Sequence, residues 1–143
     1  EQLKEQERRE NGEQEKGILD GVPLSFPALN QSQEYQDRAA RVGFDWPEID
    51  RVLDKLMEEI EEIRQARNTE ELASEIGDLF FVLVNFARWQ GVDAESALRE
   101  ANIRFKYRFS YIEKHARKEG HPMTEMTLDE MEALWQEAKE LKS

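Results

Sequence analysis

Apolar residues recur every three or four positions along most of the chain, which is typical of α-helices that bury one face. The clearest case begins at Ile49, after the break "GFDWPEID", and continues to about Ile63. Its spacing predicts an amphipathic helix. The apolar positions in this stretch are Ile49, Val52, Leu53, Leu56, Ile60 and Ile63.

Start and stop signals delimit two more helices. Pro27 fits the first turn of a helix that continues to about Arg41. Asn68 or Thr69 can cap a later helix, and Gly91 can end it. The apolar stripe of this later helix comprises Leu72, Ile76, Leu79, Phe80, Leu83 and Ala87. The pattern therefore predicts three helices before the last third of the chain.

The last third of the chain is also helical in pattern. Asp93 opens a long helix that extends to about Lys118. Thr127, with Glu130 three residues later, forms the capping-box pattern that starts a last short helix. No stretch shows the alternation of a β-strand, so we expect an all-α helical bundle of four to five helices with short connections.

The first 21 residues differ in composition from the rest of the chain. They are highly charged and almost free of apolar residues, which is typical of a linker or a disordered segment. We expect one domain over residues 22–143, since 143 residues with 38% hydrophobic content support a single core. The chain begins with Glu1 rather than Met, so we expect a processed product or a part of a longer protein.

The stretch "LFFVLVNFA", residues 79–87, is apolar on nearly every side of a helix. A small bundle covers one face well, so we expect the remainder, including Phe81 and Val84, to meet a second copy of the chain. The alternative is that the terminal helices of the same chain cover it.

Charge and composition exclude several classes of protein. A net charge of −12 argues against nucleic-acid binding, which depends on Lys and Arg neutralising phosphates. The longest apolar run, residues 79–84, is too short for a membrane helix, and no signal-peptide pattern is present. The absence of cysteine excludes thiol chemistry and suits a reducing compartment, so we expect a cytoplasmic protein.

Acidic residues suggest a metal site. Glu59 and Glu62 share one flank of a helix, and Glu75 and Asp78 share a flank of the next. If these helices form an antiparallel pair, the four carboxylates converge and repel one another unless a cation binds. Ligation by oxygen alone selects Mg²⁺, Mn²⁺ or Ca²⁺. The alternative is an acidic face that is simply exposed to solvent.

The long helix carries two arginines one turn apart. By helical spacing, Arg108 lies within its apolar stripe of Ala97, Ala101, Phe105 and Ile112, and Arg104 lies at the edge. A buried guanidinium needs an anion, and two of them can bind successive phosphate groups. The alternative is that both arginines neutralise the carboxylates as structural ion pairs.

The spacing of "EEIEE" and "EIGD", followed by "NIRFKYRF", resembles the MazG family of nucleoside triphosphate pyrophosphohydrolases. The similarity extends from "LDGVPLSFPAL" to "MEALWQEAK" and looks most like the carboxy-terminal catalytic domain of a two-domain protein. The resemblance implies the all-α nucleoside triphosphate pyrophosphatase fold, commonly dimeric. It also implies Mg²⁺-dependent cleavage between the α and β phosphates, with Mn²⁺ as a substitute.

The resemblance also implies roles for individual residues. The metal ligands would be Glu59, Glu62, Glu75 and Asp78, with Glu58 a fifth acid. Glu59 is our candidate for the group that activates water, with Glu58 as second choice. The phosphate contacts would come from Arg104, Arg108, Asn102 and Lys55. Three aromatic residues, Trp135, Trp46 and Phe44, are candidates to stack on a base or, alternatively, core residues.

Two other functions remain open from the sequence. One is a non-catalytic helical dimer whose acids bind metal for stability or contact another protein. The other is an enzyme of the same fold with a single preferred base, such as a dUTP or dCTP hydrolase.

Overall fold

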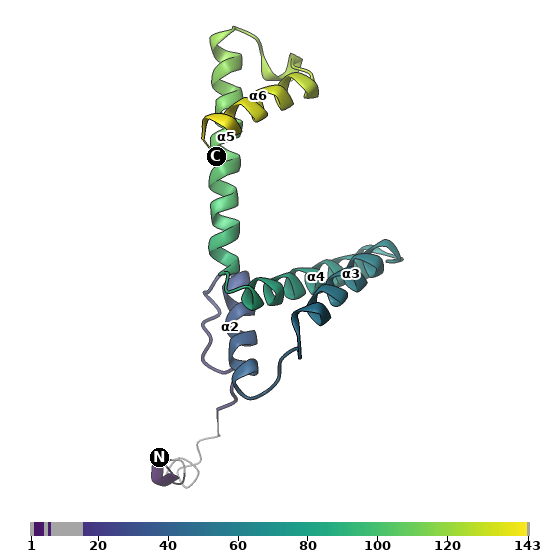
Figure 1. The fold of residues 1–143 in the computed structure, drawn as a ribbon, viewed down its shortest axis with the longest axis vertical. Helices are drawn as coiled ribbons and strands as arrows, with labels where there is room; N and C mark the ends of the chain where they lie inside the picture. Colours follow the sequence, from purple (N-terminus) through teal and green to yellow (C-terminus); the bar gives the residue numbers. More distant parts are fainter. Residues whose placement is uncertain (1, 5, 7–15, 143) are drawn as a thin grey trace. The chain divides into compact units, whose positions relative to one another are not determined.

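The structure, a computed structural model, describes residues 2–4, 6 and 16–142, and within these residues it is helical without strands (Figure 1). The elements are α2 Ala28–Arg41, α3 Ile49–Arg64, α4 Thr69–Trp89, α5 Ala94–Lys118, the short 3₁₀ helix η1 Met123–Glu125 and α6 Leu128–Leu141. The all-α prediction is confirmed. Most of the predicted linker, residues 1–21, lies outside the described residues.

The predicted caps and stops fix the helix ends. Asn68 Oδ1 accepts a hydrogen bond of 2.9 Å from the backbone N–H of Glu71 at the start of α4. Thr127 and Glu130 form the complete capping box of α6. Gly91 follows α4 with a φ of 70°, a left-handed conformation that favours glycine. These boundaries therefore follow from local sequence chemistry.

Contacts group the chain into two compact units, residues 1–95 and 96–143. In the first unit α3 and α4 form an antiparallel pair that is joined by the short turn 65–68, and α2 packs against α4 (Figure 1). A single domain over 22–143 stays a prediction.

The first unit buries a mixed apolar and polar face. Val52 of α3 and Val82 and Val84 of α4 are buried, together with the polar side chains of Gln36 and Asn85. Val84 is 2% exposed, so the expectation that it meets a second copy was wrong. It packs within its own chain.

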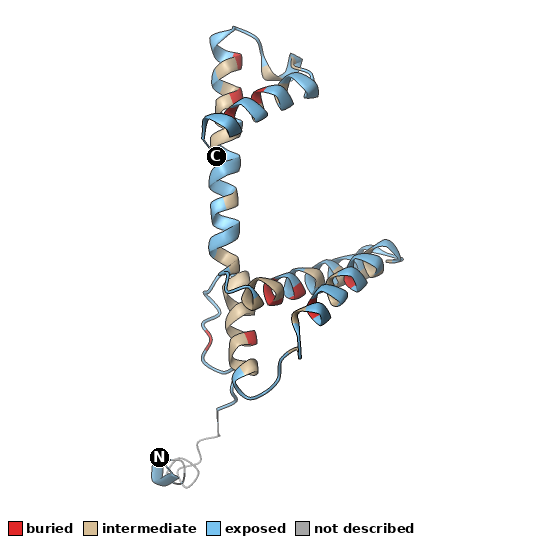
Figure 2. Ribbon diagram, viewed as in Figure 1, coloured by how far each residue is buried: buried red, intermediate tan, exposed pale blue. Residues whose placement is uncertain are grey.

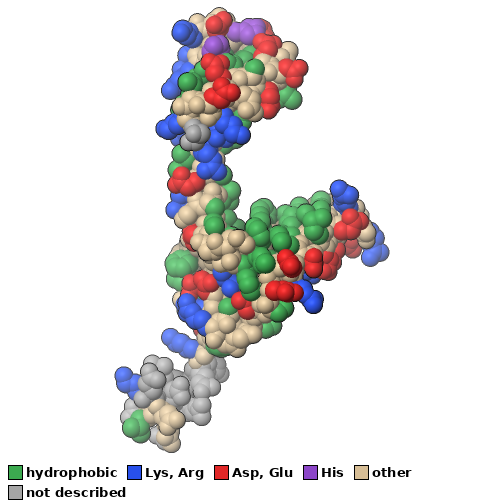
Figure 3. All heavy atoms as spheres, viewed as in Figure 1, with side chains coloured by type: hydrophobic (Ala, Val, Ile, Leu, Met, Phe, Trp, Pro, Cys, Tyr) green, Lys and Arg blue, Asp and Glu red, His purple; other side chains and the backbone are tan. Residues whose placement is uncertain are grey.

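The predicted apolar stripes of α3 and α4 are largely exposed, which corrects the expectation that they form the core. Besides Phe81, which is 44% exposed, the exposed apolar side chains of the two helices are Leu53, Met57, Ile60, Leu72, Ile76, Phe80 and Leu83. We call this set the α3–α4 apolar face; Figure 3 shows hydrophobic side chains gathered along these two helices. Figure 2 shows the few buried positions of the pair and the extent of its exposed surface. One short helix, α2, cannot cover both faces of a helix pair.

In the second unit α6 packs against the later part of α5. The buried side chains here are Ile112, Ala116, Leu134 and Ala138. Phe105, placed in the buried stripe by helical spacing, is 58% exposed. That placement was wrong, because α6 covers α5 from about Phe105 onward on one side only, where Trp135 lies 5.5 Å from the Phe105 ring.

The Asn68 cap should contribute measurably to folding, because α4 carries half of the acidic motif. We predict that Asn68→Ala lowers the free energy of unfolding by about 1 kcal/mol, since the N–H of Glu71 loses its acceptor. Urea denaturation measures it. Asn68→Asp keeps the acceptor and should stay close to the wild type; equal stability of the alanine and aspartate variants would contradict the capping role.

Candidate metal and nucleotide site

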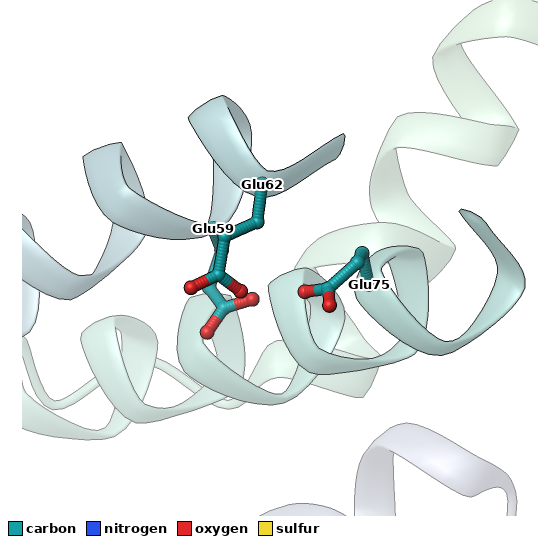
Figure 4. Close-up of side chains that lie close together, drawn as sticks. All are labelled: Glu59, Glu62 and Glu75. Atoms are coloured by element: carbon teal, nitrogen blue, oxygen red, sulfur yellow. The ribbon is translucent and has the colours of Figure 1, made fainter. Parts of the chain in front are cut away.

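Three carboxylates meet between α3 and α4. One ligand oxygen from each of Glu59, Glu62 and Glu75 lies within 4.8 Å of the others. Figure 4 shows Glu59 and Glu62 extending from α3 toward Glu75 on α4. The predicted convergence of the two acidic pairs is therefore seen for three of the four residues.

The packing of α3 on α4 places these acids inside the first unit rather than on its surface. Glu59 is only 3% exposed, and Glu62 and Glu75 are half-buried. The Oε2 atoms of Glu59 and Glu75 are buried and find no hydrogen-bond partner among the residues described. Buried acceptors without donors destabilise a fold, so this arrangement suits a ligand that satisfies them.

The neighbouring acids shift the pKa of Glu75. The neighbouring carboxyl of Glu62, then partial burial, then Glu59, raise the pKa of Glu75 from 4.5 to about 7. The raised pKa favours the protonated, neutral form of Glu75, which lowers the negative charge of the cluster. A divalent cation would compensate the same negative charge more fully.

The remaining predicted acids lie beside this cluster. Asp78 is exposed and is not one of the three converging groups, but it lines a cavity together with Glu59 and Lys55. Glu58 is exposed, and the Nζ of Lys55 lies 3.1 Å from Oε1 of Glu58 and of Glu59. These two glutamates, Glu58 first, raise the pKa of Lys55. Lys55 therefore compensates part of the negative charge at one edge of the acidic cluster.

A cavity of about 680 Å³ adjoins the acidic cluster within the first unit. Lys55, Glu59 and Asp78 line one part of it. Its aromatic lining comprises Tyr35, Phe44, Trp46 and Phe81. The predicted aromatic residues Phe44 and Trp46 thus lie at the same cavity as the carboxylates, and a volume of this size is typical of small-molecule sites.

Sequence reasoning missed two polar residues of this cavity, Gln36 and Asn85, each 6% exposed. The side-chain Nε2 of Gln36 donates a 3.0 Å hydrogen bond to the backbone carbonyl of Phe81. Asn85 Oδ1 accepts a 3.0 Å hydrogen bond from Nη2 of Arg88. For Asn85 the available signal was a polar residue in an apolar stretch, since a buried carboxamide is uncommon. Gln36 stands in a polar stretch, which gives no such signal.

The loop between α2 and α3 is attached to α4 by Asp45. Its carboxylate accepts hydrogen bonds from Arg88, from Trp89 Nε1 at 3.2 Å and from the backbone N–H of Trp46 at 2.8 Å. The hydrogen bond from Arg88 is the largest influence and lowers the pKa of Asp45. This attachment fixes the wall of the cavity that carries Trp46.

The other predicted substrate contacts lie in the second unit. Arg104 and Asn102 are exposed, and Arg108 is half-buried with its guanidinium 5.4 Å from the Trp135 ring centroid. The Nε of Arg108 is buried without a hydrogen-bond partner among the described residues. The roles of these four residues in phosphate or base binding stay predictions.

The donor set fits a hard divalent cation. All three converging groups are carboxylates, and oxygen ligands are those that Mg²⁺, Mn²⁺ and Ca²⁺ prefer. The two unpartnered Oε2 atoms supply acceptor capacity that no described side chain uses. The site can therefore hold a metal ion next to a cavity large enough for a nucleotide.

Comparison with known proteins agrees with this geometry. The family described as phosphoribosyl-ATP pyrophosphohydrolase matches residues 27–105, more than half of the chain. The chain belongs to this family. The matched stretch contains α2, α3 and α4, and with them all three converging acids.

Two of the curated relatives that the chain matches are named nucleoside triphosphate pyrophosphohydrolases, and a third, YabN, is named as uncharacterised. It is 42% identical over 144 aligned positions to the nucleoside triphosphate pyrophosphohydrolase of Escherichia coli K12, covering 97% of this chain and 54% of the relative. It is 35% identical to the nucleoside triphosphate pyrophosphohydrolase/pyrophosphatase MazG of Thermotoga maritima, covering 92% and 51%. It is also 40% identical to Bacillus subtilis YabN, covering 93% and 28%. The MazG resemblance is confirmed.

The chain spans about half the length of the first two of these relatives. In the part of the chain that the structure describes, none of the helices combines the length and the apolar character required to span a membrane.

The raised pKa of Glu75 predicts a pH effect on stability. Between about 4.5 and about 7, the folded chain holds a proton on Glu75 that the unfolded chain has released, so this group's contribution to stability falls as pH rises. We predict that Glu75→Gln loses less stability than the wild type between about pH 5 and about pH 8 in EDTA. Melting temperatures measured across this pH range test the prediction. An equal change of melting temperature with pH in both proteins would contradict the raised pKa of Glu75.

Proposed function

We propose that the chain hydrolyses nucleoside triphosphates between the α and β phosphates, giving a nucleoside monophosphate and pyrophosphate. The observation that carries this proposal is the meeting of Glu59, Glu62 and Glu75 beside a cavity that is partly lined by aromatic residues. The names of the relatives from E. coli and T. maritima agree with it.

The residues of the site would have the following roles in this reaction. Glu59, Glu62, Glu75 and Asp78 would hold Mg²⁺, with Mn²⁺ as a substitute. A bound divalent ion would neutralise phosphate oxygens and acidify a bound water. The oxygen of the water forms a bond to either the α or the β phosphorus. The bond from the attacked phosphorus to the oxygen that bridges the α and β phosphates then breaks. The leaving phosphate keeps the bridging oxygen and its electron pair.

Glu59 is the best placed acid to take the proton of that water. Its Oε1 pairs with Lys55 at 3.1 Å, while its buried Oε2 has no partner among the described side chains. Glu58 is exposed and pairs with Lys55 alone among the ion pairs described, so it is a weaker candidate. Lys55 lines the cavity and offers a positive charge to a phosphate oxygen.

The nucleoside would occupy the aromatic part of the cavity. Phe44, Trp46 and Tyr35 offer ring surfaces on which every base can stack, so we propose a loose base preference. The family description names phosphoribosyl-ATP, a triphosphate that cleavage of the same bond would convert to pyrophosphate and the monophosphate. A substrate panel that includes it, dUTP and dCTP identifies the preferred substrate. A cytoplasmic location and the absence of nucleic-acid binding remain predictions.

A homodimer accounts for the α3–α4 apolar face. Seven apolar side chains on two packed helices are between 36% and 68% exposed, which is more than isolated surface residues explain. A second copy of the same chain can cover this face through a two-fold axis. The competing function, a metal-binding dimer without catalysis, predicts the same interface but no pyrophosphate release.

We predict that Glu62→Gln lowers pyrophosphate release from ATP with Mg²⁺ by at least about a hundredfold, because the metal loses a charged ligand. Helical content should stay unchanged. Asp78→Asn tests the fourth acid in the same assay. The matched control is Glu61→Gln, one position earlier on α3, since Glu61 is exposed and its carboxylate accepts a hydrogen bond only from Gln65 among those described.

Near-normal turnover of Glu62→Gln would refute the ligand assignment. The absence of pyrophosphate release by the wild type, with Mg²⁺ and with every nucleotide of the panel, would favour the non-catalytic alternative.

The dimer has its own test. We predict that the wild type sediments as a dimer at micromolar concentration and that Phe80→Glu, which places a charge on the α3–α4 apolar face, sediments as a monomer. Leu128→Glu changes an exposed leucine on α6 and serves as the control. A monomeric wild type would contradict the interface.

A further inference from the structure

Gln36 lines the cavity, and the carbonyl oxygen of its buried side chain has no hydrogen-bond partner among the residues described. Its side chain is among the most buried polar groups of the first unit, with 6% of the residue exposed. Its Nε2 donates to the backbone carbonyl of Phe81, and its Oε1 is buried without a partner among the residues described. The carboxamide therefore presents a fixed donor to the protein and a free acceptor.

A free acceptor limits what the ligand can be. Phosphate oxygens at neutral pH carry no donor, so Oε1 would repel them rather than bind them. Its partner must supply an N–H or an O–H.

The point at which Gln36 of α2 contacts α4 favours the base over the triphosphate. Phe81, which Gln36 contacts, lies six residues beyond Glu75 on α4, or about 9 Å along the helix axis. If the phosphates lie at the acidic cluster, this distance leaves room for the ribose before the base. Tyr35 and Phe81, which line the cavity next to Gln36, offer rings for the base.

We propose that Gln36 determines base selection by accepting one hydrogen bond from an N–H on the Watson–Crick edge of the base, an inference that rests on the proposed function. Adenine and cytosine offer an exocyclic amino group there, and guanine, uracil and thymine offer a ring N–H. One acceptor therefore admits every common base and rejects a base without such a donor. Loose base preference then has a structural cause.

The sharpest test compares ATP with purine riboside triphosphate, which lacks only the exocyclic amino group of adenine. We expect the wild-type kcat/KM to be roughly tenfold lower for the analogue. In Gln36→Met, which keeps the length of the side chain, kcat/KM for ATP should fall to about the value for the analogue. The ratio between the two substrates should then approach one.

Gln33→Met is the matched control on the same helix. Gln33 donates to the carbonyl of Val92 at 3.1 Å and accepts from the N–H of Ala94 at 2.8 Å, and it is outside the cavity lining. The ratio of ATP to analogue should stay at its wild-type value in this variant. Circular dichroism of both variants checks folding, and if Gln36→Met does not fold, Gln36→Leu takes its place in the same comparison.

Three results would overturn the proposal. The wild type could use ATP and the analogue equally well. Gln36→Met could keep the wild-type ratio. Gln36→Met could instead lose discrimination between ATP and its 2′-deoxy or 3′-deoxy forms, which would assign Oε1 to a ribose hydroxyl. In each case pyrophosphate release from ATP persists, so the proposed function survives; no release from any nucleotide would refute both.

Discussion

Repulsion among three carboxylates held within 4.8 Å of one another is the constraint on which the rest of the first unit depends. Such groups tolerate proximity only with a counter-charge or a shared proton. The protein supplies part of this through Lys55 at one edge and through the raised pKa of Glu75 at the other. The remaining deficit of positive charge is what makes the site suitable for a divalent cation.

This constraint also explains the unusual distribution of apolar side chains. The packed face of α3 and α4 is occupied by Glu59 and Asn85 as well as by valines, and α2 adds Gln36 to it. Because polar side chains occupy part of the packed face, this face cannot bury all the apolar residues of both helices. The α3–α4 apolar face therefore stays exposed, and this exposure is the basis of the proposed dimer.

The helices and their ends could be predicted from sequence because the signals are local. The caps at Asn68 and Thr127 and the glycine stop at Gly91 depend on residues within one turn. The choice of buried face could not be predicted from one sequence, because periodicity shows which apolar residues share a face but not which partner covers that face. Phe80 and Leu83, which the pattern placed in the apolar stripe of α4, are exposed for this reason.

Only part of the candidate site could be predicted from the sequence. The acidic spacing placed Glu59, Glu62 and Glu75 together, since it is a property of two neighbouring helices. Gln36 was missed because it meets Phe81 across a separation of 45 residues, and no local pattern marks such a contact. Arg108 shows a related limit: its helical position placed it in a buried stripe, and the structure pairs it with the ring of Trp135.

Calorimetric titration of the nucleotide-free chain with Mn²⁺ tests the central claim most directly, because it measures the cation site without turnover. The account predicts saturable binding that is abolished by Glu62→Gln, retained by Glu61→Gln and weaker at about pH 5 than at about pH 8, since protons compete for the carboxylates. Equal Mn²⁺ affinity of the wild type and Glu62→Gln would contradict the account, because the three converging acids would then not form the metal site.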